Sequence, residues 1–190
     1  MIIMTSPEEI RTRLPDPIVA DRLVLRRPRR DDATALQRLA NNFAVHKMLA
    51  RLPHPYTMEH AHDFIDNICR SAADHGYAIT RDDAFVGVIG FHFGTAADRD
   101  RLEIGYWLGE PYWGKGYASE AAVALISALH VIDPGVRLVA RALADNPASR
   151  RVLEKSGFTL TSETTGDCGQ HAGQLIRYFE WQGGGHNERT

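Results

Sequence analysis

The chain has 190 residues, of which 44% are hydrophobic and 24% charged, which fits one globular domain and excludes a disordered chain. The formal net charge of −2 provides no field for binding nucleic acid or an anionic membrane surface. No apolar run approaches the about 18 residues of a membrane span, and residues 1–17 lack the features of a signal peptide. Cys69 and Cys168 match no zinc or redox spacing, so we expect a reduced, cytoplasmic protein, with one disulfide as the alternative.

The expected elements follow from the spacing of apolar residues. Residues 1–18 contain three prolines and predict a loose N-terminal arm. Helical spacing predicts helices over residues 31–40, 44–50, 57–75, 114–132 and 147–156. Short apolar runs predict strands over residues 23–25, 77–80, 85–91, 102–108, 137–143, 158–162 and 175–181. This order predicts an α/β (α+β) fold with a mixed sheet, one domain over residues 1–182, and a disordered polar tail over residues 183–190.

The run from Glu103 to Glu120 is the richest segment, because a strand leads there through a glycine turn into a helix. Gly114 and Gly116 let the backbone approach a ligand closely, and Lys115 adds positive charge. The free N–H groups at the start of the helix point at one place, which suits a phosphate. A plain glycine turn between strand and helix is the alternative without a ligand.

Two familiar phosphate motifs match this run incompletely. Gly109, Gly114 and Lys115 match most of a P-loop, but Gly116 stands where a magnesium-binding Ser or Thr belongs. Gly114, Gly116 and Ser119 imitate a dinucleotide fingerprint, but the third glycine is missing and no acidic residue closes a second strand.

Residues 101–158 resemble the GNAT superfamily of N-acetyltransferases, in particular its RimJ/RimL-like branch. The stretches 103–108 and 112–121 are similar to the pyrophosphate-binding segment of that branch. The superfamily pattern Arg/Gln-x-x-Gly-x-Gly/Ala falls on Trp113, Gly116 and Ala118, so Trp113 replaces the leading Arg or Gln. The resemblance implies a mostly antiparallel sheet of about seven strands flanked by helices. In such a sheet the strand ending at residue 108 splays from strand 137–143, and the acyl-CoA arm fills the gap.

The resemblance also implies acetyl-CoA as co-substrate and no metal. The residues expected to hold acetyl-CoA are Tyr106, Trp107, Leu108, Trp113, Gly114, Lys115, Gly116, Tyr117, Ala118, Ser119, Asn146 and Ser149.

A second motif begins at Asn146. Asn146 suits a helix N-cap, Pro147 the first helical position, and Gly157 the C-terminal stop. Ser149 shares the inner face of this helix, where a polar atom needs a partner; the alternative is a bond within its own first helical turn.

What the resemblance implies for this motif is more specific. Asn146 would contact the pantetheine arm. Many GNAT enzymes carry a Tyr seven residues later that protonates the leaving thiolate, but this chain has Leu153 there. The RimJ/RimL-like branch favours the Ser three residues after the Asn, so Ser149 is our candidate acid.

The implied reaction is direct attack of a neutral amine on the acetyl thioester, with backbone N–H groups of strand 104–108 stabilising the oxyanion. Glu103 is the first candidate for the general base. The alternatives are that Glu103 pairs with Arg101 or Arg137, and that a water chain removes the proton. Some GNAT enzymes carry a Glu where this chain has Arg141. His92 is expected to be a partly satisfied surface histidine, with a place near the acceptor as the alternative.

The acceptor pocket of such a fold would be built by residues 41–58 and 161–173, where Glu163 and Asp167 could attract an amine. The branch implies the α-amino group of a protein N-terminus, of the ribosomal-protein type. The alternatives are a small-molecule amine (an aminoglycoside, a polyamine or an amino-acid-like compound) and a non-catalytic acyl-CoA-binding sensor. We expect no nucleic-acid or membrane partner; the last hairpin could form a homodimer.

Overall fold

The computed structural model describes residues 6–94, 101–166 and 169–183. Cys168 and residues 184–190 of the predicted tail lie outside these ranges.

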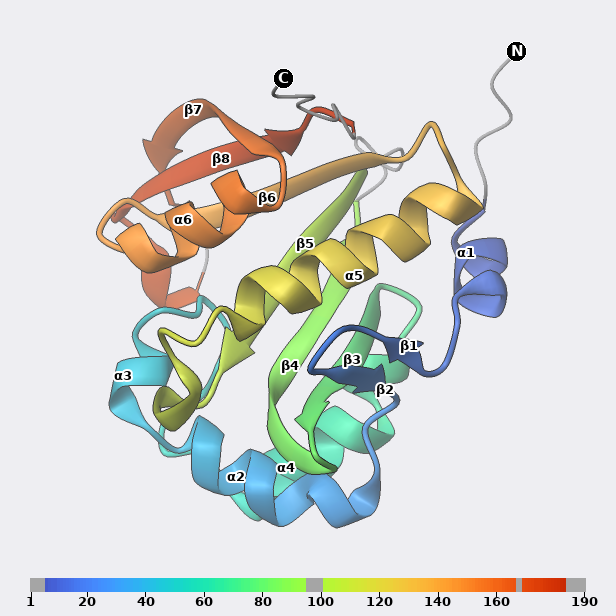
Figure 1. The fold of residues 1–190 in the computed structure, drawn as a ribbon. Helices are drawn as coiled ribbons and strands as arrows, with labels where there is room; N and C mark the ends of the chain where they lie inside the picture. The colour runs from blue at the N-terminus through green and yellow to red at the C-terminus, as the bar shows by residue number, and fades with distance from the viewer. Residues whose placement is uncertain (1–5, 95–100, 167–168, 184–190) are drawn as a thin grey trace.

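Eight strands form a single sheet in the order β1-β2-β3-β4-β5-β6-β8-β7 (Figure 1). Their bounds are β1 Ile18–Val19, β2 Val24–Arg26, β3 Asp74–Arg81, β4 Ala84–Phe93, β5 Arg101–Leu108, β6 Arg137–Leu143, β7 Phe158–Thr165 and β8 Leu175–Trp181. Only the β5–β6 pair is parallel; the other neighbours are antiparallel. The predicted mixed, mostly antiparallel sheet is confirmed, with the short β1 as an additional strand.

Helices cover both faces of the sheet. They are α1 Pro7–Arg13, α2 Ala33–Ala40, α3 Phe43–His46, α4 Met58–Asp66, α5 Tyr117–Ile132 and α6 Pro147–Lys155. Short 3-10 turns occupy η1 Arg30–Asp32, η2 Ile68–Arg70, η3 Glu110–Tyr112 and η4 Gly169–His171. The long α5 crosses one face and shares the larger core with β4 and β5, whereas α2 and α4 cover the other face with a second core (Figure 1).

The prediction of a loose N-terminal arm is wrong for the residues from Ser6 onwards. Ser6 and Glu9 form a capping box at the start of α1, and Pro7 occupies the first turn, where a proline fits a helix. Ile10 and Leu14 are buried in the larger core. The proline therefore begins a packed helix here rather than a loose segment.

The helix predicted over residues 57–75 is too long. Helix α4 ends at Asp66, and η2 leads from there into β3. Gly76, expected at the helix end, lies inside β3 opposite Gly90 of β4. A Cβ on Gly76 would lie 3.1 Å from the Cβ of Cys69, so the glycine lets η2 approach the strand.

The strands β5 and β6 diverge in the middle of the sheet. Their pairing runs from Arg101 opposite Arg137 to Ile104 opposite Ala140 and ends there. Beyond this point β5 stays paired with β4 as far as Leu108, and β6 stays paired with β8 as far as Leu143. The splayed pair expected from the resemblance is therefore present, and it opens the sheet between β5 and β6.

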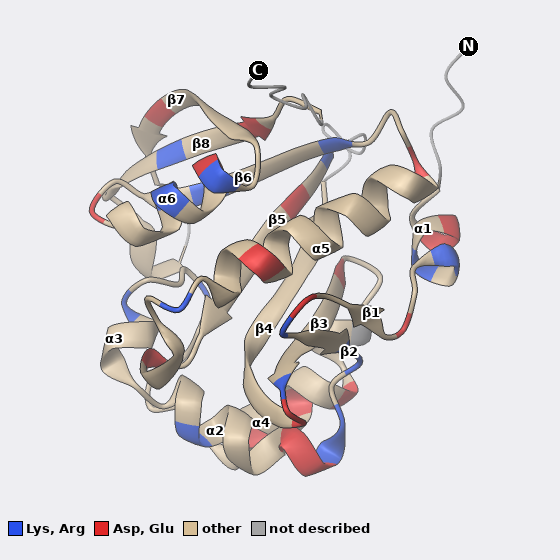
Figure 2. Cartoon of the chain, viewed as in Figure 1, with Lys and Arg blue, Asp and Glu red and all other residues tan. Residues whose placement is uncertain are grey.

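Charged residues of both signs are interspersed over the outer elements, and the view in Figure 2 shows no face of one sign. In the part of the chain that the structure describes, no helix has the length and apolar character needed to cross a membrane.

Candidate functional site

A cavity of about 530 Å³ lies where β5 and β6 diverge. We call one part of it the loop half; it is lined by β5, the glycine turn and α6 through Tyr106, Trp107, Leu108, Trp113, Gly114, Gly116, Tyr117, Ala118, Ser119, Asn146 and Ser149. We call the other part the wall half; it is lined by Val45, Met48, Leu49, Ala50, Glu103, Arg141, Gly166, His171, Ile176 and Tyr178. Of the residues expected to hold acetyl-CoA, Lys115 alone is not among the lining residues, and its Nζ lies 5.6 Å from the centre of the Tyr112 ring.

The loop half ends at the N-terminus of α5. Gly116 is the N-cap, with a φ of +80° and no side-chain cap, and Gly114 has a φ of +73°. Both values are disfavoured for other residues, which explains the two glycines. The first backbone N–H groups of α5, at Tyr117, Ala118 and Ser119, are therefore free of a side-chain cap and line the cavity. Together with the positive end of the helix dipole, they form a site for an anion.

Arg22, from the turn between β1 and β2, holds this loop in place. Its backbone N and its Nε donate to the two carboxylate oxygens of Glu120 at 2.6 and 2.8 Å. Its Nη1 donates to the carbonyl of Lys115 at 3.2 Å, and its guanidinium lies over the Tyr117 ring. An arginine distant in sequence thus supports the turn and adds positive charge beside it.

Trp113 closes the same turn from the other side. Its indole Nε1 donates to the carbonyl of Leu108 at 2.7 Å, which ties the glycine turn to the end of β5. The residue that departs from the superfamily pattern therefore has a structural partner in this chain.

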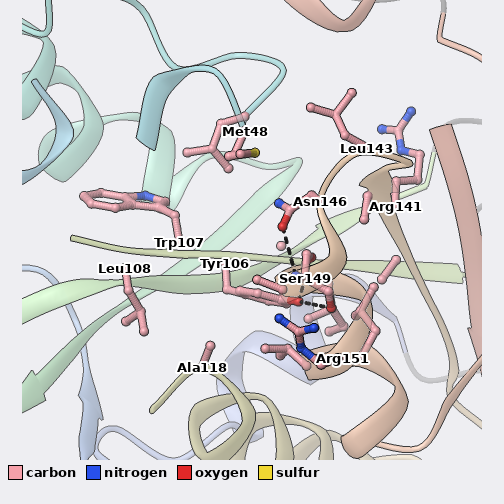
Figure 3. Close-up of a pocket in the computed structure, with 18 of the residues that line it drawn as sticks. Met48, Tyr106, Trp107, Leu108, Ala118, Arg141, Leu143, Asn146, Ser149 and Arg151 are labelled. Atoms are coloured by element: carbon pink, nitrogen blue, oxygen red, sulfur yellow. Dashed lines mark hydrogen bonds between the residues drawn. The ribbon is translucent and has the colours of Figure 1, made fainter. Parts of the chain in front are cut away.

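Ser149 faces the cavity at the start of α6 (Figure 3). Asn146 caps the helix by accepting from the backbone N of Ser149 at 3.0 Å. The Ser149 hydroxyl and the Tyr106 hydroxyl are 2.9 Å apart, and Tyr106 also lies 3.2 Å from the Ser149 carbonyl. Ser149 Oγ is therefore bonded across the cavity to β5, whereas Leu153, in the position of the usual tyrosine, is buried in the larger core.

Burial raises the pKa of Tyr106 to about 12, although the hydrogen bond from Ser149 acts in the opposite direction. The Tyr106 phenol therefore stays protonated at neutral pH and can donate a hydrogen bond to Ser149.

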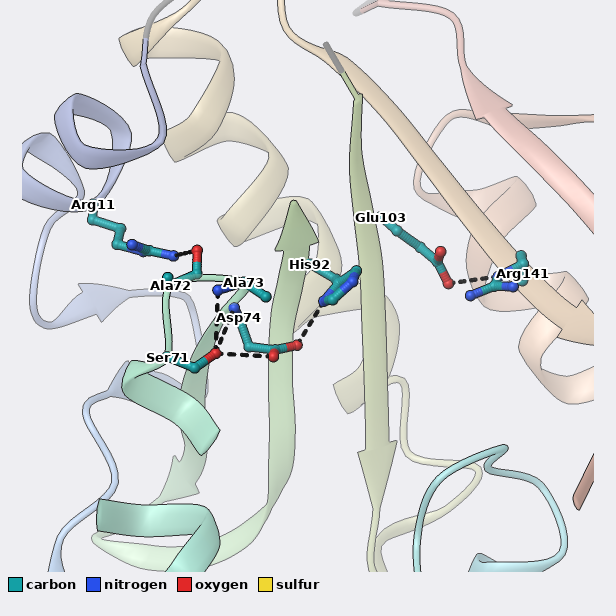
Figure 4. Close-up of polar contacts among 8 residues, drawn as sticks. All are labelled: Arg11, Ser71, Ala72, Ala73, Asp74, His92, Glu103 and Arg141. Carbon is teal, nitrogen blue, oxygen red and sulfur yellow. Dashed lines mark hydrogen bonds and ion pairs between the residues drawn. The ribbon is translucent and has the colours of Figure 1, made fainter. Parts of the chain in front are cut away.

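Glu103 pairs with Arg141, whose Nε donates to its carboxylate at 2.8 Å (Figure 4). Burial lowers the pKa of Arg141, but the hydrogen bond and charge of Glu103, together with the interactions with Tyr178, outweigh it and the pKa is raised. Both side chains line the wall half, so an ion pair stands beside the gap between β5 and β6.

His92 lies opposite Glu103 on β4, but it is not a lining residue of the cavity. Its Nδ1 is 2.8 Å from the carboxylate of Asp74, which also contacts Ser71 (Figure 4). This arrangement matches the surface role expected for His92, not the alternative of a place near the acceptor. Over the described ranges, no group of three or more His, Cys, Asp or Glu side chains is arranged to hold a metal ion.

The two segments expected to build the acceptor pocket meet in the wall half. The side-chain amide of Gln170 in η4 donates to the carbonyls of His46, at 2.6 Å, and Leu49. Its backbone N donates to the carbonyl of Ala50 at 3.2 Å. Gly169 has a φ of +56°, and a Cβ there would lie 2.1 Å from the Ala50 oxygen, so only glycine fits.

Of the two acidic residues expected in this pocket, Glu163 is not found in it. The carboxylate of Glu163 accepts from Arg177 at 2.6 Å, and Glu163 does not line the cavity. Asp167 lies outside the described residues. The structure instead brings Arg141 and His171 to the wall half, neither of which the sequence motifs assign to the site.

Comparisons with known proteins agree with this geometry. The family model described as an acetyltransferase (GNAT) domain matches residues 22–159. The ribosomal-protein-serine acetyltransferase of Escherichia coli is 38% identical over 91 residues, which cover 45% of this chain and 49% of that protein. This chain thus spans about half the length of that relative. The uncharacterized N-acetyltransferase YoaA of Bacillus subtilis is 32% identical over 143 residues, which cover 73% of this chain and 80% of that protein.

Among solved structures, a RimL ribosomal-protein alpha-N-acetyltransferase in complex with coenzyme A has a TM-score of 0.75 and 22% sequence identity. The match covers 87% of this chain and 97% of that one, and it shows that the two share a fold.

Proposed function

The chain belongs to the GNAT acetyltransferase family and is an acetyl-CoA-dependent acetyltransferase, and from this premise we propose that its acceptor is the α-amino group of a protein N-terminus. The proposal is supported by the cavity between β5 and β6, which has an anion site in its loop half and the wall half as its other part. Such a cavity can hold two substrates in contact, so that the acetyl group moves directly between them.

The loop half suits acetyl-CoA. The free N–H groups of residues 117–119 and the glycine turn hold the pyrophosphate, supported by Arg22. The pantetheine arm fills the gap between β5 and β6, where the main chain of residues 106–108 has no strand partner on the β6 side. Apart from the Leu108 carbonyl, which the Trp113 indole already bonds, the backbone groups that face this gap are available to the arm and to the thioester oxygen.

In the reaction, the nitrogen of the neutral amine attacks the thioester carbon, and the carbon–sulfur bond then breaks. Ser149 gives its hydroxyl proton to the leaving thiolate and regains a proton from solvent, while the protonated Tyr106 donates a hydrogen bond that stabilises the serine oxygen. Glu103 accepts the proton that the amine nitrogen loses and passes it to solvent. Arg141 positions Glu103 through their ion pair.

The choice of a protein N-terminus rests on two supports. The relative with 38% identity is named for acetylating a ribosomal protein, and the matched RimL structure is named for the same kind of substrate. The wall half also offers apolar residues, such as Val45, Met48 and Ile176, for the first residue of a peptide.

The test is release of free thiol from acetyl-CoA in the presence of N-terminal peptides, aminoglycosides, polyamines and amino acids. We expect release with peptides, and mass spectrometry should find the acetyl group on the α-amine. Release with a small amine alone would contradict the acceptor and support small-molecule acetylation. Tight acetyl-CoA binding without release under any amine would contradict catalysis and support an acyl-CoA sensor.

A further inference from the structure

His171 is a buried histidine with one ring nitrogen unused. It lies in η4, its relative exposure is 8%, and it is one of the residues that line the wall half. Within the described residues, its Nε2 is buried and has no hydrogen-bond partner. Buried side-chain polar atoms are bonded in the large majority of cases, so an exception calls for an explanation.

The contact made by the other ring nitrogen, Nδ1, determines which tautomer His171 adopts. Burial lowers the pKa of His171, while a hydrogen bond with the Lys47 backbone acts in the opposite direction. A bond that favours the protonated ring is donated by the ring, so the Lys47 carbonyl is the acceptor. Because Nε2 is unpartnered, the donor is Nδ1. Because burial disfavours the protonated ring, we infer that the neutral ring carries its proton on Nδ1 and presents a lone pair at Nε2.

The neighbours of His171 in the wall half do not satisfy this lone pair. Val45, Met48 and Ile176 are apolar. The nearby Arg141 interacts with His171 only as a repelling charge, and its Nε is engaged by Glu103. The position of η4 is itself fixed, because Gln170 bonds the backbone of the facing segment. A fixed acceptor atom in the wall of a substrate cavity is suited to a donor that arrives with the substrate.

We propose that Nε2 of His171 accepts a hydrogen bond from a neutral N–H or O–H group that lies next to the amine being acetylated. This inference rests on the proposed function and deepens it, because it names the chemistry that selects the acceptor. A peptide N-terminus has two such donors: its first amide N–H and, where the first residue is Ser or Thr, a side-chain hydroxyl. A simple alkylamine has neither.

Two substitutions separate the two ring nitrogens. His171→Asn keeps a donor where Nδ1 contacts Lys47 but has no group at the place of Nε2. His171→Gln reaches that place with its amide oxygen and so retains an acceptor. Three substrates complete the design: a Ser-initiated peptide, the same peptide with Ala first, and the same peptide with its first amide replaced by an ester. The Ala peptide lacks only the hydroxyl, and the ester lacks only the first amide N–H.

We expect wild type to prefer the complete peptide over one of the two reduced substrates by roughly three- to tenfold in kcat/KM, which corresponds to one neutral hydrogen bond. His171→Asn should abolish this preference with unchanged acetyl-CoA affinity, and His171→Gln should retain part of it. If wild type uses the Ala peptide less well than the complete peptide, the hydroxyl is the donor. If it uses the ester less well, the first amide N–H is the donor.

Equal use of all three substrates by wild type would overturn the proposal, as would an undiminished preference in a folded His171→Asn variant. A second readout does not depend on turnover: the ¹⁵N resonance of His171 Nε2 should shift when the peptide binds in the presence of coenzyme A. If no amine is acetylated, the proposed function fails. The inference is then tested by this resonance alone: a shift on peptide binding supports it, and an unchanged resonance with bound peptide overturns it.

Discussion

Ser149 and Tyr106 form a pair of hydroxyl groups at the centre of the cavity, where Leu153 provides no proton donor. The serine is the proposed proton donor, because its hydrogen bond to the neutral Tyr106 phenol leaves the serine hydroxyl proton available to the leaving thiolate. The tyrosine stays protonated, since burial raises its pKa to about 12. We therefore expect substitutions of the two residues to lower kcat by different amounts.

Ser149→Ala should lower kcat by about 100-fold, the usual cost of losing a general acid, with acetyl-CoA affinity within about twofold of wild type. Tyr106→Phe should lower kcat by only about tenfold, since it removes one supporting hydrogen bond. Steady-state kinetics with calorimetric acetyl-CoA titrations provide the measurement. Ser162→Ala, at an exposed position of β7, is the control. Wild-type turnover in Ser149→Ala would refute the role of the serine.

At the scale of residues, the sequence predicted contacts within one motif better than contacts between motifs. Asn146 as N-cap and the inward direction of Ser149 follow from spacing along one helix. The Tyr106–Ser149 contact joins residues 43 apart in the chain, and the Glu103–Arg141 pair joins residues 38 apart. Both depend on the register of β5, and a slip of one residue would turn Tyr106 and Glu103 to the other faces of the sheet.

Among the elements, the start of α5 has the strictest backbone requirement. Gly116 caps the helix in the left-handed region, and Arg22 approaches to 3.4 Å of the place where a Cβ would stand. Any other residue would be strained there by about 1 kcal/mol or more because of its positive φ, and its Cβ would contact the arginine that supports the loop.

Gly116→Ala should therefore weaken acetyl-CoA binding by about tenfold, because the N–H groups of the first turn lose their alignment. Isothermal titration calorimetry measures the change. Gly183→Ala is the matched control: Gly183 has a similar φ of +76°, but lies after β8, away from the cavity. Equal affinity in the two variants would show that the loop tolerates the side chain and that its amides do not hold the pyrophosphate.

The elements also show where sequence patterns mislead. Three prolines predicted a loose arm, yet Pro7 starts α1, and the capping pair Ser6 and Glu9 was the better signal. Gly76 looked like a helix end, but it serves close packing between η2 and β3. A proline or a glycine indicates that the backbone is constrained at that position. Whether the constraint is a turn, a helix end or close packing depends on the residues around it in the folded protein.

At the scale of the whole molecule, the two faces of the sheet carry separate cores, and a buried ion pair connects β2 to the helices of the smaller one. Asp32 accepts from both terminal nitrogens of Arg26, at 2.7 and 2.8 Å, and from the backbone N of Arg29. Burial would raise the pKa of Asp32, but the hydrogen bonds from Arg26 and Arg29 outweigh it and the pKa is lowered.

A lowered pKa means that this carboxylate stabilises the fold above its ordinary pKa of 3.8 and that the stabilisation is lost as the pH falls through the folded value. Asp32→Asn should cost about 3 kcal/mol at pH 7, because it leaves Arg26 unpaired, and the difference from wild type should shrink below about pH 4. Thermal unfolding between pH 3 and 7 measures both effects. Asp82→Asn, at an exposed residue, should track wild type throughout. A pH-independent difference would refute the ion-pair explanation.

The wall half was the part of the molecule least open to prediction, because no local pattern joins its two segments. Gln170 and His46 are 124 residues apart in the chain and meet only in the folded protein. The sequence indicated which two segments build the pocket, but it did not indicate Gly169, Gln170 or His171 as the residues that join and line it.

The same contact has a consequence for the evolution of the enzyme. Because Gly169 admits no side chain beside Ala50, and Gln170 bonds the backbone of residues 46–50, neither segment can change shape alone. A new acceptor preference must arise from paired changes in both, while the glycine turn and α5 stay as they are. Chimaeras that exchange the two segments together should stay folded and inherit the donor's preference, and chimaeras that exchange only one should lose the wall.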